Sequence, residues 1–144
     1  MAAVDLSAEK LEQARAAGAE MTAQGEGAGR TLQKAHGGVD AAIVMTPSPA
    51  AIQQAFRALR RNGTLVLVGL AVSSYELPLV DTVLKGITVR GSYLGTREDL
   101  AAIFALALEG AVRPHVHIHA LAETPVLLES MRRGEFSGRA VIAF

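Results

Sequence analysis

The chain alternates short apolar runs with polar segments that begin and end like helices, and this alternation limits the fold more than any other feature. Apolar runs predict strands over 1–5, 39–45, 64–69, 87–92 and 138–144. Helices are predicted between them, because residues that cap helix N-termini precede these segments. The clearest start signals are Ser7, Ser48-Pro49, Thr96 and Thr124-Pro125. Strands that alternate with helices indicate an α/β fold with a parallel sheet covered by helices on both faces.

Several stretches carry weaker signals. A short strand is predicted over 20–23, a glycine-rich loop over 24–30, a short helix over 31–36, and extended segments over 75–79 and 115–119. The helix that begins at Ser48-Pro49 is predicted to end at Asn62-Gly63. The alternation changes after Gly110, so two units are predicted, one over 1–110 and one over 111–144.

Composition excludes several classes of function. Lys plus Arg and Asp plus Glu each number 14, so the formal net charge is zero, without the basic surplus that nucleic-acid binding requires. The chain has no cysteine, which excludes disulfides, thiolate catalysis and a cysteine-held zinc. The longest apolar run, over 65–72, is far shorter than the ~20 residues that span a bilayer, and residues 1–10 lack a signal-peptide pattern. We therefore expect a cytoplasmic protein that binds neither nucleic acid nor membrane.

Asp5 and Lys10 form the first candidate binding pair. Asp5 ends a predicted strand and Lys10 lies one turn into the following helix. In doubly wound sheets, a carboxylate at the end of the second strand accepts hydrogen bonds from adenosine ribose hydroxyls. The same carboxylate repels a 2′-phosphate, so it favours NAD over NADP. The alternative is an ordinary solvated pair of surface charges.

The ends of three predicted strands form the second candidate. Ligands in open α/β sheets lie outside the carboxyl ends of the strands, and small residues there let a flat ring approach the backbone. The alternative is a set of ordinary turns, which favour the same residues. The residues in question are Thr46, Val68, Gly69, Leu70, Ser92 and Leu94.

Three histidines and one arginine complete the candidates. His115, His117 and His119 share one face if they lie on a strand, where they could bind Zn²⁺ or Ni²⁺, but their spacing is wide for one ion. A partly exposed strand is the alternative, and no metal site is assigned. Arg139 precedes the last apolar strand, where its guanidinium could bind a phosphate or form a salt bridge. No catalytic residue is assigned.

Together these segments resemble the C-terminal part of a zinc-dependent alcohol dehydrogenase of the medium-chain dehydrogenase/reductase family. The resemblance depends on the order and spacing of six segments and covers nearly the whole chain. They are VDLSAEKL at 4–11, AAGA at 16–19, GVDA at 38–41, GTLVLVGL at 63–70, ITVRGS at 87–92 and SGRAVI at 137–142.

The resemblance implies an NAD-binding Rossmann unit followed by a short return into the catalytic domain. Asp5 and Lys10 would hold the adenosine ribose, Thr46 would lie near the adenosine, and Arg139 would approach the pyrophosphate. The nicotinamide would be framed by Val68, Leu70, Ser92 and Leu94, with Gly69 between the first two. Family dimers join their sheets at the edge that corresponds to the segment between Tyr75 and Ser92, which implies a homo-oligomer.

The departures from the family pattern shape the expected function. The first Rossmann strand, its glycine-rich turn and the N-terminal catalytic domain with its zinc ligands have no counterpart in this sequence. The fold is therefore expected to be an incomplete, doubly wound parallel sheet, with two half-sheets and unpaired edges where the central strand is missing.

The sequence thus predicts the cofactor-binding part of an NAD-dependent alcohol dehydrogenase, inactive alone because the zinc ligands are absent. Whether this chain is itself an enzyme stays open, as does the alcohol. Two alternatives remain: a non-enzymatic nucleotide-binding or dimerisation module, and one chain of a split enzyme that needs a separate N-terminal catalytic domain.

Overall fold

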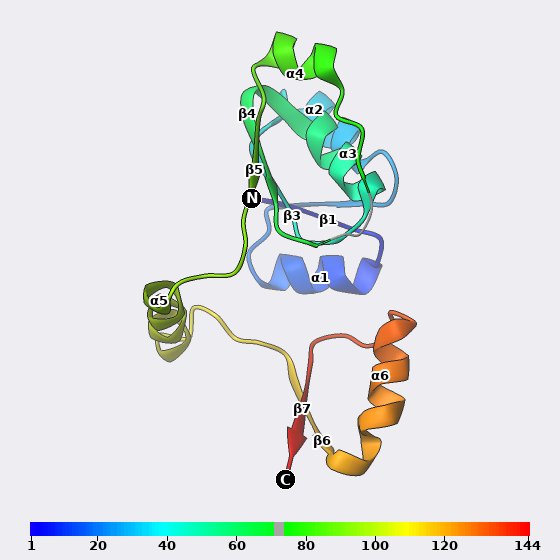
Figure 1. The fold of residues 1–144 in the computed structure, drawn as a ribbon, viewed down its shortest axis with the longest axis vertical. Coiled ribbons are helices and arrows are strands. Elements are labelled where there is room, and N and C mark those ends of the chain that lie inside the picture. Colours follow the sequence, from blue (N-terminus) through cyan, green and yellow to red (C-terminus); the bar gives the residue numbers. More distant parts are fainter. Residues whose placement is uncertain (71–73) are drawn as a thin grey trace. The chain divides into compact units, whose positions relative to one another are not determined.

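The computed structural model describes residues 1–70 and 74–144 and divides the chain into two compact units (Figure 1). The first unit is Met1–Tyr93 and the second is Leu94–Phe144. Each unit is described by itself. Every residue classed as buried lies in the first unit, which therefore holds the hydrophobic core of the described chain.

The first unit opens with a two-stranded parallel sheet. Strand β1 (Ala2–Asp5) pairs in parallel with β2 (Met21–Gln24), and helix α1 (Ala8–Ala16) connects them. Ser7 caps this helix, because its side-chain oxygen accepts the Lys10 N–H at 3.4 Å. Leu11 is buried and attaches α1 to the sheet. The cap and the buried leucine together fix where the chain turns after β1.

A three-stranded parallel sheet forms the rest of the first unit. Its order is β3-β4-β5, with β3 (Val39–Val44), β4 (Leu59–Leu67) and β5 (Thr88–Gly91). Helix α3 (Pro49–Ala58) connects the first two strands and helix α4 (Leu79–Lys85) the last two. The core lies between α3 and one face of this sheet and contains Val44, Phe56, Leu59 and Leu65.

Helix α2 (Ala28–His36) joins the two sheets of the first unit. It contacts β2, β3 and α3, and the figure shows α2 and α3 side by side (Figure 1). Gly29 makes the close approach possible, because a Cβ built on it would lie 2.2 Å from the carbonyl oxygen of Gln54. A side chain at this position would push α2 and α3 apart.

The second unit contains a capped helix and a small parallel sheet. Helix α5 (Arg97–Leu108) begins with a capping box, in which the Thr96 side chain accepts the Asp99 N–H and the Asp99 carboxylate accepts the Thr96 N–H. Strands β6 (Val116–Ala120) and β7 (Arg139–Ala143) pair in parallel. Between them come a 3₁₀ turn, η1 (Leu121–Glu123), and helix α6 (Thr124–Arg132).

The expected fold class is confirmed. All three sheets are parallel, and helices alternate with strands along the chain, as in a Rossmann-like α/β fold. The expected half-sheets are also present, because the described strands of the first unit form separate sheets of two and three strands. The unit boundary expected after Gly110 stays a prediction, since compactness alone divides the chain after Tyr93.

Three local predictions were wrong. The loop expected over 24–30 is shorter, because Gln24 ends β2 and Ala28 already begins α2. Helix α3 ends at Ala58 rather than at Asn62-Gly63, because fully buried Leu59 turns the chain into β4. The extended segment expected over 75–79 is too long, because Leu79 already begins α4. The C-terminus of this helix is stabilised by Arg61 Nη2, which donates to the Leu84 carbonyl oxygen at 2.8 Å.

Candidate functional site

Asp5 lies at the carboxyl end of the first strand, where the sequence predicts it. It is the last residue of β1, it is half-buried, and its Oδ1 accepts the Ser7 N–H at 2.9 Å. Among the described residues no hydrogen bond to Oδ2 is present. The bond to Ser7 fixes the carboxylate at the carboxyl edge of the first sheet, with one oxygen left to bind a hydroxyl group.

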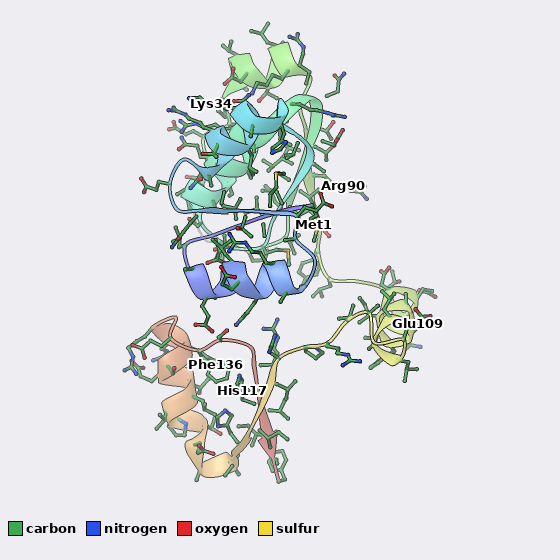
Figure 2. All side chains as sticks on the ribbon, turned by 180° about the vertical axis from the view of Figure 1, so that it is seen from behind. Met1, Lys34, Arg90, Glu109, His117 and Phe136 are labelled. Carbon is green, nitrogen blue, oxygen red and sulfur yellow. The ribbon has the colours of Figure 1, made fainter. Side chains whose placement is uncertain are left out.

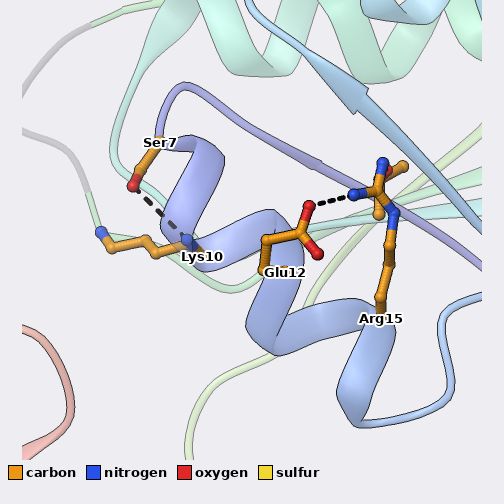
Figure 3. A network of polar contacts seen from close by, with 5 residues as sticks. Ser7, Lys10, Glu12 and Arg15 are labelled. Atoms are coloured by element: carbon orange, nitrogen blue, oxygen red, sulfur yellow. Dashed lines mark hydrogen bonds and ion pairs between the residues drawn. The ribbon is translucent and has the colours of Figure 1, made fainter.

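Lys10 lies one turn into α1 and is exposed. Its side chain extends on the side of Ser7, whereas the Glu12–Arg15 ion pair lies further along the same helix (Figure 3). Glu12 therefore neutralises Arg15 rather than Lys10, which leaves the Lys10 ammonium available near the N-terminus of α1. The predicted role of Lys10 in holding a ribose remains a prediction.

The carboxyl ends of β3 and β4 are tied together by two hydrogen bonds to one acceptor. The Val44 carbonyl oxygen accepts the Val68 N–H at 3.0 Å and the Gly69 N–H at 3.1 Å. The Ser92 N–H in turn donates to the Leu67 carbonyl oxygen at 2.9 Å. The residues that follow β3, β4 and β5 consequently emerge at one edge of the three-stranded sheet.

Gly69 brings these strand ends closer than any other residue would allow. A Cβ on Gly69 would lie 2.6 Å from the carbonyl carbon of Thr46 and 2.8 Å from the carbonyl oxygens of Met45 and Thr46. Real Cβ atoms do not approach backbone so closely, so glycine is required here for packing. Thr46 and Leu70, on either side of this contact, are exposed.

Leu94 and Arg139 belong to the second unit. Leu94 has φ 52°, which is uncommon for a residue with a branched side chain, and 81% of its surface is exposed. Arg139 begins β7, where its N–H donates to the His115 carbonyl oxygen at 2.8 Å. Its exposed guanidinium donates to the carbonyl oxygen of Gly138 at 3.0 Å. Their proposed contacts with a cofactor remain predictions.

The histidines serve packing and capping in the second unit. The His117 ring meets Phe136 edge to face, with centroids 5.7 Å apart (Figure 2). His119 Nδ1 lies 3.4 Å from Glu123 Oε1, and Glu123 Oε2 accepts the Ala120 N–H at 2.8 Å. Hydrogen bonding, first from this backbone N–H and then from His119, lowers the pKa of Glu123. Across residues 1–70 and 74–144, no three His, Asp or Glu side chains are placed to hold a metal ion.

Tyr75 is half-buried and was not among the candidate residues predicted from the sequence. Within the described residues its hydroxyl oxygen is buried and has no hydrogen-bond partner. Burial raises the pKa of the Tyr75 phenol above 10.0, and the positive charge of Arg57 opposes this shift in part. The sequence does not predict the burial of this hydroxyl group, because the residues around Tyr75 carry no periodic pattern.

The sequence model described as "Zinc-binding dehydrogenase" matches residues 1–109. The chain belongs to this family. It is 39% identical over 142 residues to an alcohol dehydrogenase of Geobacillus stearothermophilus and 40% identical over 144 residues to one of Rhizobium meliloti. These matches cover 97% and 99% of this chain but 42% of each relative, so the chain spans about two fifths of their length.

Solved structures of the family superpose on the chain. The alcohol dehydrogenase of Aeropyrum pernix gives a TM-score of 0.92 at 29% identity, covering 99% of this chain and 42% of that one. The family dehydrogenases therefore share the α/β architecture of this chain and contain further polypeptide besides it. Among the residues that the structure describes, no helix is both long and apolar enough to cross a membrane.

Proposed function

We propose that the chain is the NAD-binding part of a zinc-type alcohol dehydrogenase, in which the complete enzyme transfers a hydride between an alcohol and NAD. The observation that carries this proposal is Asp5 at the carboxyl end of β1, held by the Ser7 N–H at 2.9 Å. A carboxylate fixed at this place suits the two hydroxyls of an adenosine ribose. Lys10 in the next helical turn supplies a cation beside the same sugar.

The strand ends support the nicotinamide side of the proposal. The close contact of Gly69 with Thr46 keeps side-chain atoms out of the edge where β3 and β4 end. The N–H groups of Val68 and Ser92 already donate to the carbonyl oxygens of Val44 and Leu67. The carbonyl oxygens of Val68 and Ser92 and the backbone of Leu70 would then be the partners for a ring carboxamide. For Leu94 and Arg139, which belong to the second unit, the proposal rests on the family resemblance, and a guanidinium binds phosphate oxygens in pairs.

Zinc does not fit the residues of this chain. The chain has no cysteine, and its described histidines and carboxylates form no cluster of three. The zinc of a complete enzyme would polarise the alcohol oxygen, and that step has no ligands here. We therefore expect no alcohol oxidation by the chain alone.

Self-association is the second candidate function, and the outer edge of β5 favours it. β5 pairs with β4 alone among the described strands, and Val89 on it is 42% exposed. Two copies could pair through this edge, within the segment between Tyr75 and Ser92. Such a homo-oligomer is compatible with cofactor binding, and a cytoplasmic location remains the expectation from the sequence.

Titration with NADH, followed by nicotinamide fluorescence, tests the cofactor proposal. We expect saturable binding that Asp5→Ala weakens at least tenfold, while Asp81→Ala, which removes an exposed carboxylate in α4, leaves it unchanged. Asp5→Ala should also narrow the preference for NADH over NADPH, since the repulsion of a 2′-phosphate is lost. A folded protein that binds no NADH, or equal weakening by both variants, would contradict the proposal.

A further inference from the structure

Three helices end at the amino edge of the three-stranded sheet, where its strands begin. Helices α2, α3 and α4 lead into β3, β4 and β5, so this edge is opposite the carboxyl ends that the cofactor proposal uses. The last turns of these helices contain the basic residues Lys34, His36, Arg57 and Lys85. A cation in this place stabilises the helix macrodipole, so these residues alone indicate no ligand.

Two further arginines at this edge lie outside the helices. Residues 60–63 of β4 have no registered partner on β3 or β5, and Asn62 among them has φ 59°. The pairing is thus interrupted by a bulge, a feature that redirects side chains. The bulge carries Arg60 and Arg61, which are both exposed. Compensation of a helix dipole does not account for these two residues.

Short contacts connect the bulge to the ends of α2 and α4. A Cβ built on Gly38, which follows α2, would lie 2.8 Å from the backbone nitrogen of Arg60. Arg61 Nη2 donates to the Leu84 carbonyl oxygen of α4 at 2.8 Å. Lys34 of α2 lies at the same end of the first unit as α4 (Figure 2). The cations therefore share one surface, here called the basic edge, which consists of Lys34, Arg57, Arg60, Arg61 and Lys85.

The carboxylates near this surface leave most of its charge unpaired. Arg60 forms an ion pair with Asp40 of β3. Glu20, before β2, pairs with the N-terminal ammonium of Met1 at 3.1 Å, and Asp81 lies in the first turn of α4. Among the residues that the structure describes, the other four cations of the basic edge form no ion pair. The zero net charge of the chain thus conceals a local positive excess.

The helix ends restrict which anion fits the basic edge. A helix C-terminus carries about half a negative charge and leaves carbonyl oxygens without partners, so it repels a compact phosphate group. Phosphate groups are bound instead at helix N-termini. A polypeptide suits this surface better, because its backbone N–H groups can donate to the free carbonyl oxygens. Its carboxylates can at the same time bind the guanidinium groups of Arg60 and Arg61, each through paired hydrogen bonds.

We propose that the basic edge binds an acidic polypeptide segment of a partner protein. The bulge supplies the two guanidinium groups at its centre, and Lys34, Arg57 and Lys85 extend the positive surface over the ends of three helices. The proposal does not depend on cofactor binding, which uses the opposite edge of the sheet. A nucleic acid, whose phosphates would meet the same cations, is the competing ligand.

Fluorescence anisotropy with a labelled oligo-glutamate peptide and the intact chain tests the proposal. We expect saturable binding at low salt that weakens as salt is added, because exposed charges are screened. A labelled DNA oligonucleotide of equal charge should bind more weakly. Absence of saturable peptide binding overturns the proposal, and so does binding of the oligonucleotide that is as tight as binding of the peptide.

Matched double variants locate the contact. Arg60→Ala combined with Arg61→Ala should weaken peptide binding about tenfold, since two charge-assisted contacts are lost. The control combines Arg97→Ala with Arg113→Ala, which removes the same charge from two exposed arginines of the second unit. Equal weakening by the two double variants would show that net charge alone attracts the peptide, and the proposal would fail.

Two single variants separate recognition from folding. Asp40→Asn removes the carboxylate that pairs with Arg60, so the peptide should bind about threefold more tightly, whereas a folding defect would weaken binding. Lys34→Ala changes an exposed residue of α2 and should weaken binding even if the double arginine variant does not fold. Affinity that neither rises in Asp40→Asn nor falls in Lys34→Ala overturns the proposal.

Discussion

The N–H of Gly29 in α2 donates to Oε1 of Gln54 in α3 at 3.4 Å, and the main chains of the two helices touch at this point. Helix α2 follows β2 of the first sheet, and α3 connects β3 and β4 of the second sheet. The contact between the two helices therefore holds the two sheets in one unit. The packing of the first unit therefore depends on a position where no side chain fits.

Gly29→Ala should lower the free energy of unfolding by about 1–3 kcal/mol, because the added Cβ would overlap the Gln54 carbonyl oxygen. Urea unfolding followed by circular dichroism measures the change. Gly91→Ala is the control, since a Cβ on Gly91 meets nothing within 4 Å. Equal stability of the two variants would show that the helices can separate without cost.

Gly69→Ala should destabilise the strand ends by a similar amount, about 1–3 kcal/mol, since the new Cβ would meet the Thr46 backbone. It should also weaken NADH binding more than the loss of stability explains, because the new Cβ would push apart the ends of β3 and β4. Fluorescence titration at a temperature where the variant remains folded measures this. Unchanged affinity would mean that the ring does not bind at this edge.

Phe56→Ala should cost about 3–5 kcal/mol, because Phe56 is only 1% exposed in the core beside Leu59. The matched substitution Phe104→Ala, at a residue that is 61% exposed on α5, should change the stability by less than about 0.5 kcal/mol. Both values come from urea unfolding. A larger loss from Phe104→Ala than from Phe56→Ala would place the core elsewhere.

Tyr75→Phe should alter how stability depends on pH. The pKa of Tyr75 is raised above 10.0 in the folded state, so between pH 10 and that higher pKa the unfolded chain loses a proton that the folded chain keeps. The free energy of unfolding should therefore fall as the pH rises through this window, and by less in the Phe variant. Below pH 10 the two proteins should differ by no more than about 1 kcal/mol, because the buried hydroxyl has no partner among the described residues. If the free energy of unfolding fell equally with pH in both proteins, the burial of the Tyr75 hydroxyl would be contradicted.

Thr96→Ala should raise the pKa of Asp99. That pKa is lowered by the Thr96 N–H, which donates to Asp99 Oδ2 at 2.7 Å, and by the Thr96 hydroxyl at 3.0 Å. A lowered carboxyl pKa stabilises the cap above the ordinary value of 3.8, and the effect disappears as the pH falls through the folded-state pKa. Carbon-detected NMR titration measures the shift. A pKa of Asp99 that stays unchanged would mean that the hydroxyl makes no contribution.

The sequence predicts those features that local signals determine. Ser7, Ser48 and Thr96 begin helices as expected, because each supplies the side-chain oxygen that accepts an N–H of the first turn. The parallel strands follow from apolar runs between these helices. Asp5 lies at the end of its strand for the same local reason.

The features that the sequence does not predict depend on contacts between distant residues. Leu59 leaves the helix because it is fully buried beside Phe56 and Leu65, and Asn62-Gly63 shows nothing of this packing. Helix α4 is only seven residues long, and Arg61 stabilises it from 23 positions earlier in the chain at Leu84. A hydrogen bond between residues so far apart in the chain cannot be predicted from neighbouring residues.

The uneven distribution of buried side chains has a consequence for the life of the chain in a cell. Among residues 1–70 and 74–144, the nine buried apolar residues all lie between Leu11 and Leu65, and none lies within 94–144. Local opening requires little free energy where few side chains are buried. Proteases should therefore cut within residues 94–144 well before they reach β3 and β4, so limited digestion should leave a resistant fragment that contains Leu11 to Leu65.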